Sequence, residues 1–173
     1  MQTNVTEALD ASAATRLKIW AGAVRMIADH PWVGVGYGAF PYIIGSYAGG
    51  TKGDDAHNSY LIIASEMGIP TLVVFLWILA VIFWKSRWLY RRSRDPFFKA
   101  MALGWLGGLS GLLVANMFGS RLHSEEISSY FWILCGLIMR AVWIERQTIR
   151  RSVPSVRSVR SVPSGQLIPS FPS

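Results

Sequence analysis

The chain has 173 residues, of which 51% are hydrophobic and only 16% are charged. Soluble domains carry about 25% charged residues, so this composition argues against an ordinary soluble domain and favours a membrane protein. The net charge of +7 lies mostly in two clusters that flank apolar runs. That distribution disfavours a nucleic-acid-binding face and is typical of the cytoplasmic ends of membrane helices.

Residues 10–30 have the pattern of an amphipathic helix. Apolar side chains recur on one helical face at Leu17, Trp20, Ala21, Val24, Ile27 and Ala28. Asp10 or Ser12 is expected to cap the start, and Pro31 is expected to end the helix because proline has no backbone N–H. We expect this helix to pack on the protein or to lie at the membrane surface.

A glycine-rich segment follows, with Gly34, Gly36 and Gly38 at alternate positions. Such glycines permit tight turns and close backbone approach. The segment is not a nucleotide-binding loop, because no Gly-Lys-Ser/Thr ending and no preceding strand accompany it. We therefore expect a turn that directs the next loop, residues 45–55, which is predicted to be mobile.

Three apolar runs then approach or reach the length of about 20 residues that a membrane-spanning helix needs. They predict spans over about 62–84, 99–118 and 128–145, within a membrane domain 59–146. Arg140 is expected near the cytoplasmic interface, and Glu66 at the outer, wetter end of the first span. The predicted fold is an all-α, polytopic integral membrane protein with about three transmembrane helices.

The charges also predict an orientation. Residues 1–67 hold four basic and six acidic side chains, whereas the loop around residues 85–99 is strongly basic. The positive-inside rule therefore places residues 1–58 as a periplasmic region and residues 147–173 as a disordered, basic cytoplasmic tail. Residues 1–7 lack the basic and apolar parts of a signal peptide. We accordingly expect a piece of a larger multi-span protein whose earlier helices carry this segment across the membrane.

The polar stretch 54–61 contains His57, just ahead of the first span. A histidine here is either a helix cap or a catalytic base. His30 is expected to cap its own helix, and His123 with Glu125 and Glu126 to line a solvated loop. No metal site is predicted, because Cys135 is the only cysteine and the histidine spacings match no short zinc pattern.

Several motifs together resemble the large periplasmic loop of the O-antigen ligase and polymerase superfamily. They are Arg16 with Ile19-Trp20, residues 29–40, residues 56–61 and residues 66–70, and the resemblance covers about residues 15–75. It implies a polytopic, inverting glycosyltransferase that uses undecaprenyl-diphosphate-linked oligosaccharides without a metal or other cofactor. His57 matches the catalytic histidine of this family, and Arg16 matches an arginine that engages the diphosphate. The N-terminal spans of the family, and a second arginine there, have no counterpart in this sequence.

The chemistry suits these residue types. An imidazole can take the proton of a sugar hydroxyl near neutral pH, and a guanidinium fork can hold a leaving diphosphate. We therefore predict His57 and Arg16 as catalytic residues, and Asn58 and Arg16 as substrate-binding residues. The expected acceptor is a growing glycan, lipid A core or a protein, and the expected location is the bacterial inner membrane, in contact with its lipids.

Two other hypotheses remain open at this point. The chain is alternatively a non-catalytic membrane fragment, or a subunit that a partner protein completes. A small channel or transport subunit is disfavoured, because the predicted spans carry no central charge of the kind that ion paths require.

Overall fold

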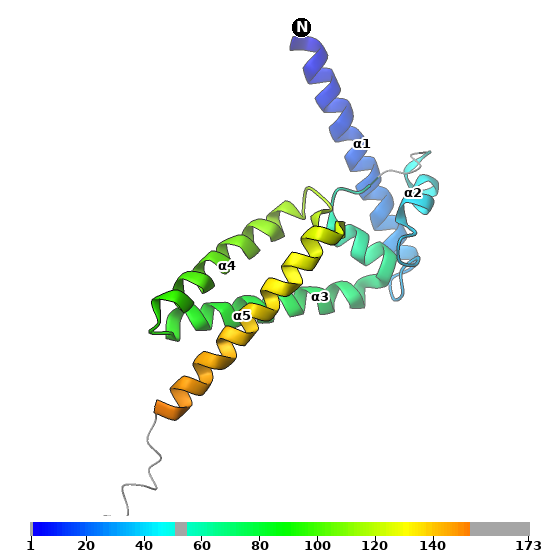
Figure 1. Cartoon of the computed structure of the whole chain (residues 1–173). Helices are drawn as coiled ribbons and strands as arrows, with labels where there is room; N and C mark the ends of the chain where they lie inside the picture. Colours follow the sequence, from blue (N-terminus) through cyan, green and yellow to red (C-terminus); the bar gives the residue numbers. More distant parts are fainter. Residues whose placement is uncertain (1, 51–54, 153–173) are drawn as a thin grey trace, which may run out of the picture.

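The computed structural model describes residues 2–50 and 55–152, and these form helices and connecting turns without a strand (Figure 1). The elements are α1 (Gln2–Asp29), α2 (Phe40–Ala48), α3 (Ser59–Arg92), α4 (Pro96–Ala115), the 3-10 turn η1 (Arg121–His123) and α5 (Glu125–Ser152). Three of them, α3, α4 and α5, are long and apolar enough to cross a membrane. The predicted all-helical, multi-span membrane fold is therefore confirmed.

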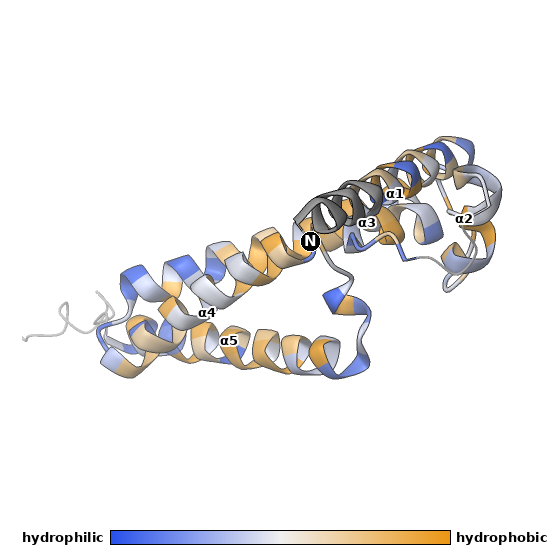
Figure 2. Ribbon diagram, turned by 90° about the horizontal axis from the view of Figure 1, so that it is seen from above, coloured by the Kyte–Doolittle hydropathy of each residue, from blue (hydrophilic) through white to orange (hydrophobic). Residues whose placement is uncertain are grey.

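The molecule has two parts that meet at the start of α3. Helices α4 and α5 both pack on α3, while α1 and α2 lie together beside its first turns, with the N-terminal half of α1 extending away (Figure 1). Hydrophobic residues run along α3, α4 and α5, and hydrophilic residues gather at their ends (Figure 2). Large apolar side chains face outward from these helices, as for Trp77, which is 65% exposed. That surface suits contact with lipid or with further membrane helices.

The third helix is broken at Gly68, which has φ 84° and ψ 166°. Pro70 follows, and its missing N–H leaves the carbonyl of Glu66 without a helical partner. The N–H of Ile69 also leaves the helix and donates to the carbonyl of Pro31 at 2.8 Å. The break thus frees two consecutive carbonyls, those of Ser65 and Glu66.

The turn after α1 fills these vacant positions. Val35 N–H donates to the Ser65 carbonyl, and Gly36 N–H donates to the Glu66 carbonyl, each at 2.9 Å. The two backbones come so close that a Cβ atom on Gly34 would overlap the Glu66 carbonyl, and one on Gly68 would overlap the Trp32 carbonyl. Glycine is required at both positions by this contact and by positive φ angles. The glycine turn and the α3 break therefore form one interlocked unit.

Glu66 extends this unit to α2. Its side chain is only 4% exposed, and its Oε1 accepts from the N–H of Phe40 at 3.0 Å, at the N-terminus of α2. A carboxylate is favoured there because it satisfies a free N–H and opposes the helix dipole. We expected Glu66 to be solvated at the outer end of the first span, but it is buried. Its hydrogen-bond partner, Phe40, belongs to α2, a helix that the sequence did not lead us to expect.

Local signals do account for α2. Pro41 lies in its first turn, and Gly49 ends it in the left-handed conformation with φ 76°. The apolar side chains of Phe40, Ile44 and Ala48 share one face and join a buried cluster with Ile19, Ala23, Met26, Ala56 and Ile62. At the edge of this contact, a hydrogen bond to Asp29 raises the pKa of the Tyr47 phenol. Helices α1, α2 and the start of α3 thus share one core.

The helices begin and end at different residues from the predicted segments. The segment 10–30 corresponds to α1, which begins earlier, at Gln2, because residues 2–9 contain neither glycine nor proline. The predicted spans 62–84 and 128–145 are the apolar middles of longer helices, since α3 continues to Arg92 and α5 to Ser152. The predicted span 99–118 is shifted, because α4 begins at Pro96 and already ends at Ala115. Residues 147–152 of the predicted tail are helical, and its residues 153–173 lie outside the described residues. The predicted mobile loop 45–55 begins inside α2, and its residues 51–54 also lie outside that range.

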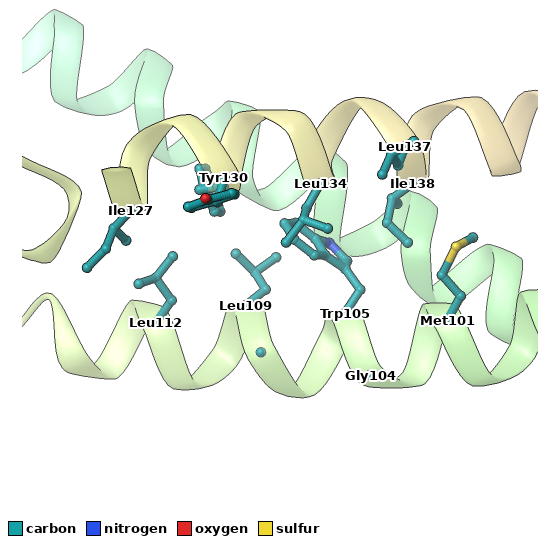
Figure 3. Close-up of a pocket in the computed structure, with 12 residues that line it drawn as sticks. Met101, Gly104, Trp105, Leu109, Leu112, Ile127, Tyr130, Leu134, Leu137 and Ile138 are labelled. Atoms are coloured by element: carbon teal, nitrogen blue, oxygen red, sulfur yellow. The ribbon is translucent and has the colours of Figure 1, made fainter. Parts of the chain in front are cut away.

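A groove of about 550 Å³ separates α4 from α5 (Figure 3). Apolar side chains of both helices line it, among them Trp105, Leu109, Leu134 and Ile138. Gly104 and Gly108 also line it and leave space there, because nothing lies within 4 Å of their Cβ positions. The indole N–H of Trp105 is the one buried side-chain N or O atom without a hydrogen-bond partner within residues 12–50 and 55–152. The phenol of Tyr130 is the one titratable group among the residues that line it.

The interlock generates a direct test of stability. We expect Gly34→Ala to lower the free energy of unfolding by about 3 kcal/mol, because a methyl group there meets fixed backbone at a positive φ. Gly38→Ala is the matched control, since Gly38 also has a positive φ of 74° but nothing within 4 Å of its Cβ position. The control should cost only about 1 kcal/mol. Thermal unfolding of the detergent-solubilised protein measures both, and equal costs would contradict the interlock.

Candidate functional site

His57 lies in the turn that leads into α3, at the end of the bundle where α4 ends and η1 begins. Its backbone φ is +47°, the one positive value at a non-glycine residue among those described. Such a conformation costs about 1–3 kcal/mol and is found most often at functional sites. The imidazole is 51% exposed, so it is accessible from outside the protein.

Asp55 holds this turn in place. Its Oδ1 accepts from the backbone N–H of His57 at 3.1 Å and from the hydroxyl of Ser120 at 2.8 Å. Its Oδ2 lies 3.8 Å from Nδ1 of His57. That separation is longer than a hydrogen bond, so Asp55 fixes His57 through its backbone N–H rather than through the ring. The sequence interpretation gave Asp55 no role, although its position two residues before His57 was a usable signal.

Trp20 fixes the other side of the turn. Its indole N–H donates to the carbonyl of Ala56 at 2.7 Å, which ties the middle of α1 to the residue before His57. A pocket of about 440 Å³ opens beside this bond. It is lined by Ser12, Ala13, Arg16, Leu17 and Trp20 of α1, together with His57 and Phe118. Arg16 and His57, 41 positions apart in the sequence, therefore line the same pocket.

Asn58 caps α3. Its Oδ1 accepts from the N–H groups of Tyr60 and Leu61 at 3.0 and 3.1 Å. The side-chain oxygen of Asn58 is thus used by the backbone, and its role in substrate binding stays a prediction that rests on its amide nitrogen. The sequence left open whether His57 caps this helix, and the structure shows that Asn58 does so instead.

Asn116 joins three elements at this end of the bundle. It is fully buried, and its Oδ1 accepts from the Ser59 hydroxyl at 2.6 Å and from Leu122 N–H at 3.1 Å. Its backbone carbonyl accepts from Ser59 N–H at 3.0 Å. Its amide group donates to the Leu112 carbonyl at 2.8 Å. Asn116 therefore positions the start of α3, where His57 and Asn58 lie, against the end of α4 and η1.

The other histidines lie apart from this pocket. His30 follows α1 directly, and its N–H continues the helical pattern to Met26 at 3.0 Å. His123 and Glu125 line a second pocket of about 530 Å³ together with Glu66. Within the described ranges, no group of three or more histidine, cysteine or acidic residues is placed to hold a metal ion.

Comparisons with known proteins point to one family. Residues 1–76 match the O-antigen ligase family, and this stretch contains Arg16, His57 and both halves of the interlock. The O-antigen ligase of Pseudomonas aeruginosa is 34% identical over 137 residues, which cover 78% of this chain and 32% of that protein. The chain thus spans about a third of the length of this curated relative. No solved structure matches the chain.

The Asn116 network leads to a prediction for this end of the bundle. Asn116→Ala should lower the free energy of unfolding by about 2–3 kcal/mol, because it leaves the buried Ser59 hydroxyl and Leu122 N–H without their acceptor. Ser110→Ala is the control, since this exposed hydroxyl bonds only to Leu106 of its own helix. It should change stability by less than about 0.5 kcal/mol. Thermal unfolding in detergent separates the two, and a stable Asn116→Ala protein would refute the structural role of the network.

Proposed function

The chain belongs, through residues 1–76, to the O-antigen ligase family, and we propose that it acts in transfer or polymerisation of undecaprenyl-diphosphate-linked oligosaccharides. The observation that carries this proposal is the pocket shared by Arg16 and His57. It combines a fixed positive charge with an exposed histidine whose backbone a carboxylate holds. Those are the two groups that the transfer of a sugar from a diphosphate requires.

In the proposed reaction, the acceptor hydroxyl attacks the anomeric carbon of the lipid-linked sugar. His57 takes the hydroxyl proton as a general base, and Asp55 on the Nδ1 side stabilises the resulting imidazolium. The bond between the anomeric carbon and the phosphate oxygen breaks, and the lipid diphosphate leaves with the electron pair. The guanidinium of Arg16 stabilises its negative charge. Attack from the face opposite the leaving group inverts the anomeric configuration.

The position of Arg16 suits this role. It lies on α1, whereas the proposed base lies ahead of α3, so the two groups can contact opposite ends of the reacting centre. The Trp20–Ala56 hydrogen bond holds α1, which carries Arg16, against the turn that carries His57. The acceptor of the reaction is left open by this geometry, and glycan, lipid A core and protein are all compatible with it.

The proposed location is the periplasmic face of the inner membrane. The bundle brings the start of α3, the end of α4 and η1 together at one end. The basic residues of the 85–99 loop and of the second half of α5 lie on the other helix ends. The positive-inside rule then favours a cytoplasmic basic end and an exterior His57 end, where the lipid-linked donor is available.

A second candidate is a non-catalytic membrane segment, or a subunit completed by a partner. The observation that favours it is length, because the chain spans 32% of its curated relative. In this case the Arg16–His57 pocket would be one wall of a larger site. The two candidates differ in whether the chain turns over substrate by itself.

The catalytic proposal is tested in two parallel arms. In the first, the chain is reconstituted in liposomes with an undecaprenyl-diphosphate-linked oligosaccharide and an acceptor. In the second, it replaces the matching 137 residues of the Pseudomonas aeruginosa O-antigen ligase, in cells that lack their own ligase. Turnover in the first arm supports an autonomous enzyme, and turnover in the second arm alone supports the completed-subunit candidate. Absence of turnover in both, with folded protein in the membrane, would contradict the catalytic proposal.

In whichever arm is active, His57→Ala should lower turnover by roughly 10²–10⁴ while leaving donor binding intact, because it removes only the base. Arg16→Lys is the complementary variant. It keeps the charge but loses the bidentate fork, so it should weaken donor binding by the ~1.5–3 kcal/mol of a charged hydrogen bond. Native mass spectrometry of the donor complex reports binding separately from turnover. Normal turnover in His57→Ala would remove the catalytic role from this residue.

The proposed orientation is tested by labelling single cysteines in a Cys135→Ala background. Ser46 on α2 and Thr148 on α5 are exposed and lie in the two parts that we place on opposite sides of the membrane. Ser46→Cys should react with an impermeant thiol reagent applied from the periplasmic side. Thr148→Cys should react only after the inner membrane is permeabilised. The reverse pattern would place His57 in the cytoplasm and refute the proposed location.

A further inference from the structure

The end of the bundle opposite His57 carries an unbalanced positive charge. Ten basic side chains lie there against two acidic ones, Asp95 and Glu145. The basic residues are Lys85, Arg87, Arg91, Arg92, Arg94, Lys99, Arg140, Arg146, Arg150 and Arg151. Within the described residues the only ion pair is that of His57 with Asp55, so none of these cations has a carboxylate oxygen within 4.0 Å. Their charge is available to an external anion.

Part of this charge surrounds a defined pocket of about 630 Å³ on the last turns of α3. Its lining forms two rows with a spacing of four residues, each passing from aromatic to basic side chains: Phe83, Arg87 and Arg91, and Trp84, Trp88 and Arg92. Residues four apart lie on the same face of a helix. Arg146 of α5 extends this surface, because its guanidinium lies over the Trp88 ring at 4.9 Å from the ring centre.

The two kinds of side chain lie at different depths. A helix rises about 1.5 Å per residue. Along the axis of α3, Phe83 and Trp84 therefore lie about 4.5–6 Å nearer its apolar middle than Arg87, and about 10–14 Å nearer than Arg91 and Arg92. Trp84 is 74% exposed, although its helix is apolar enough to cross a membrane. An exposed indole at this depth suits the boundary between acyl chains and headgroups.

We propose that this pocket, the α3 basic pocket, binds the headgroup of an anionic phospholipid. The guanidinium groups of Arg87 and Arg91 hold the phosphodiester, because their paired donors match its oxygens. The glycerol and the first acyl carbons lie against Trp84 and Phe83. Basic pockets beside membrane helices bind such headgroups. The site is separate from the pocket of Arg16 and His57, and it does not depend on the proposed reaction.

Helix stability does not account for the arrangement. Cations near a helix C-terminus interact favourably with its dipole, which suffices for Arg91 and Arg92 in the last turn of α3. The effect falls off within that turn and gives no reason for Arg87 or for an exposed Trp84. A soluble anion would use the arginines but not the deeper aromatic rings. Along α3, apolar, then aromatic, then cationic side chains follow one another. This order matches the acyl chains, the glycerol and the phosphate of a phospholipid.

The experiment compares lipid binding to the detergent-solubilised chain by native mass spectrometry. The probes are phosphatidylglycerol and phosphatidylcholine, titrated at about 0.5 M salt, where screening reduces diffuse attraction. The triple variant Arg87→Gln/Arg91→Gln/Arg92→Gln should lose its preference for phosphatidylglycerol, by about fivefold for each arginine that contacts the lipid. Trp84→Ala, which keeps every charge, should weaken binding of phosphatidylglycerol by several fold through lost acyl contact.

The control variant Arg140→Gln/Arg150→Gln/Arg151→Gln removes the same charge from the same end but does not touch the pocket. It should retain the preference for phosphatidylglycerol. Equal losses in the two triple variants would show diffuse attraction only and would overturn the proposal, as would unchanged binding in the Arg87 triple variant. If that variant does not fold, the same comparison is made with Arg87→Gln against Arg150→Gln.

Discussion

The structure depends on one backbone contact, between the turn after α1 and the break in α3. Proline at position 70 removes one helical N–H, and the turn supplies N–H groups to the carbonyls that are left free. Because buried backbone groups must be paired, neither the turn nor the break is stable without the other. The contact requires glycine at positions 34 and 68, because a side chain at either position would push the two backbones apart. Two sequence motifs that are more than thirty residues apart are therefore one structural feature.

This contact determines where the candidate site lies. It anchors the end of α1 against α3, the shared apolar core then aligns the rest of α1, and Arg16 comes to line the pocket of His57. The strained backbone of His57 is maintained by bonds on both sides, from Asp55 and through Ala56 to Trp20. In the proposed reaction, these bonds would hold the charges of the site in place, and preorganised charges contribute strongly to catalysis.

The sequence predicted the three membrane helices, because hydropathy is a local property. It predicted the glycine turn but not what the turn contacts. It missed α2, although Pro41 and Gly49 mark the ends of this helix. It misplaced Glu66 because the bond between Glu66 and Phe40 joins residues 26 positions apart. The role of Asp55 was missed although its bond to His57 N–H is local, whereas its bond to Ser120, 65 residues away, could not be predicted. Arg16 and His57 were associated through a family resemblance, and neither spacing nor periodicity would have paired them.

The central claim is that the interlock brings Arg16 and His57 to one pocket, and cross-linking tests it directly. In a Cys135→Ala background, Arg16→Cys and His57→Cys are combined and treated with a short bifunctional maleimide. The linked peptides are then quantified by mass spectrometry after proteolysis. The account predicts efficient cross-linking within one chain, and its loss when Gly68→Ala is added in protein that still inserts into the membrane. Absence of the cross-link in the folded parent protein, or a yield unchanged by Gly68→Ala, would contradict it.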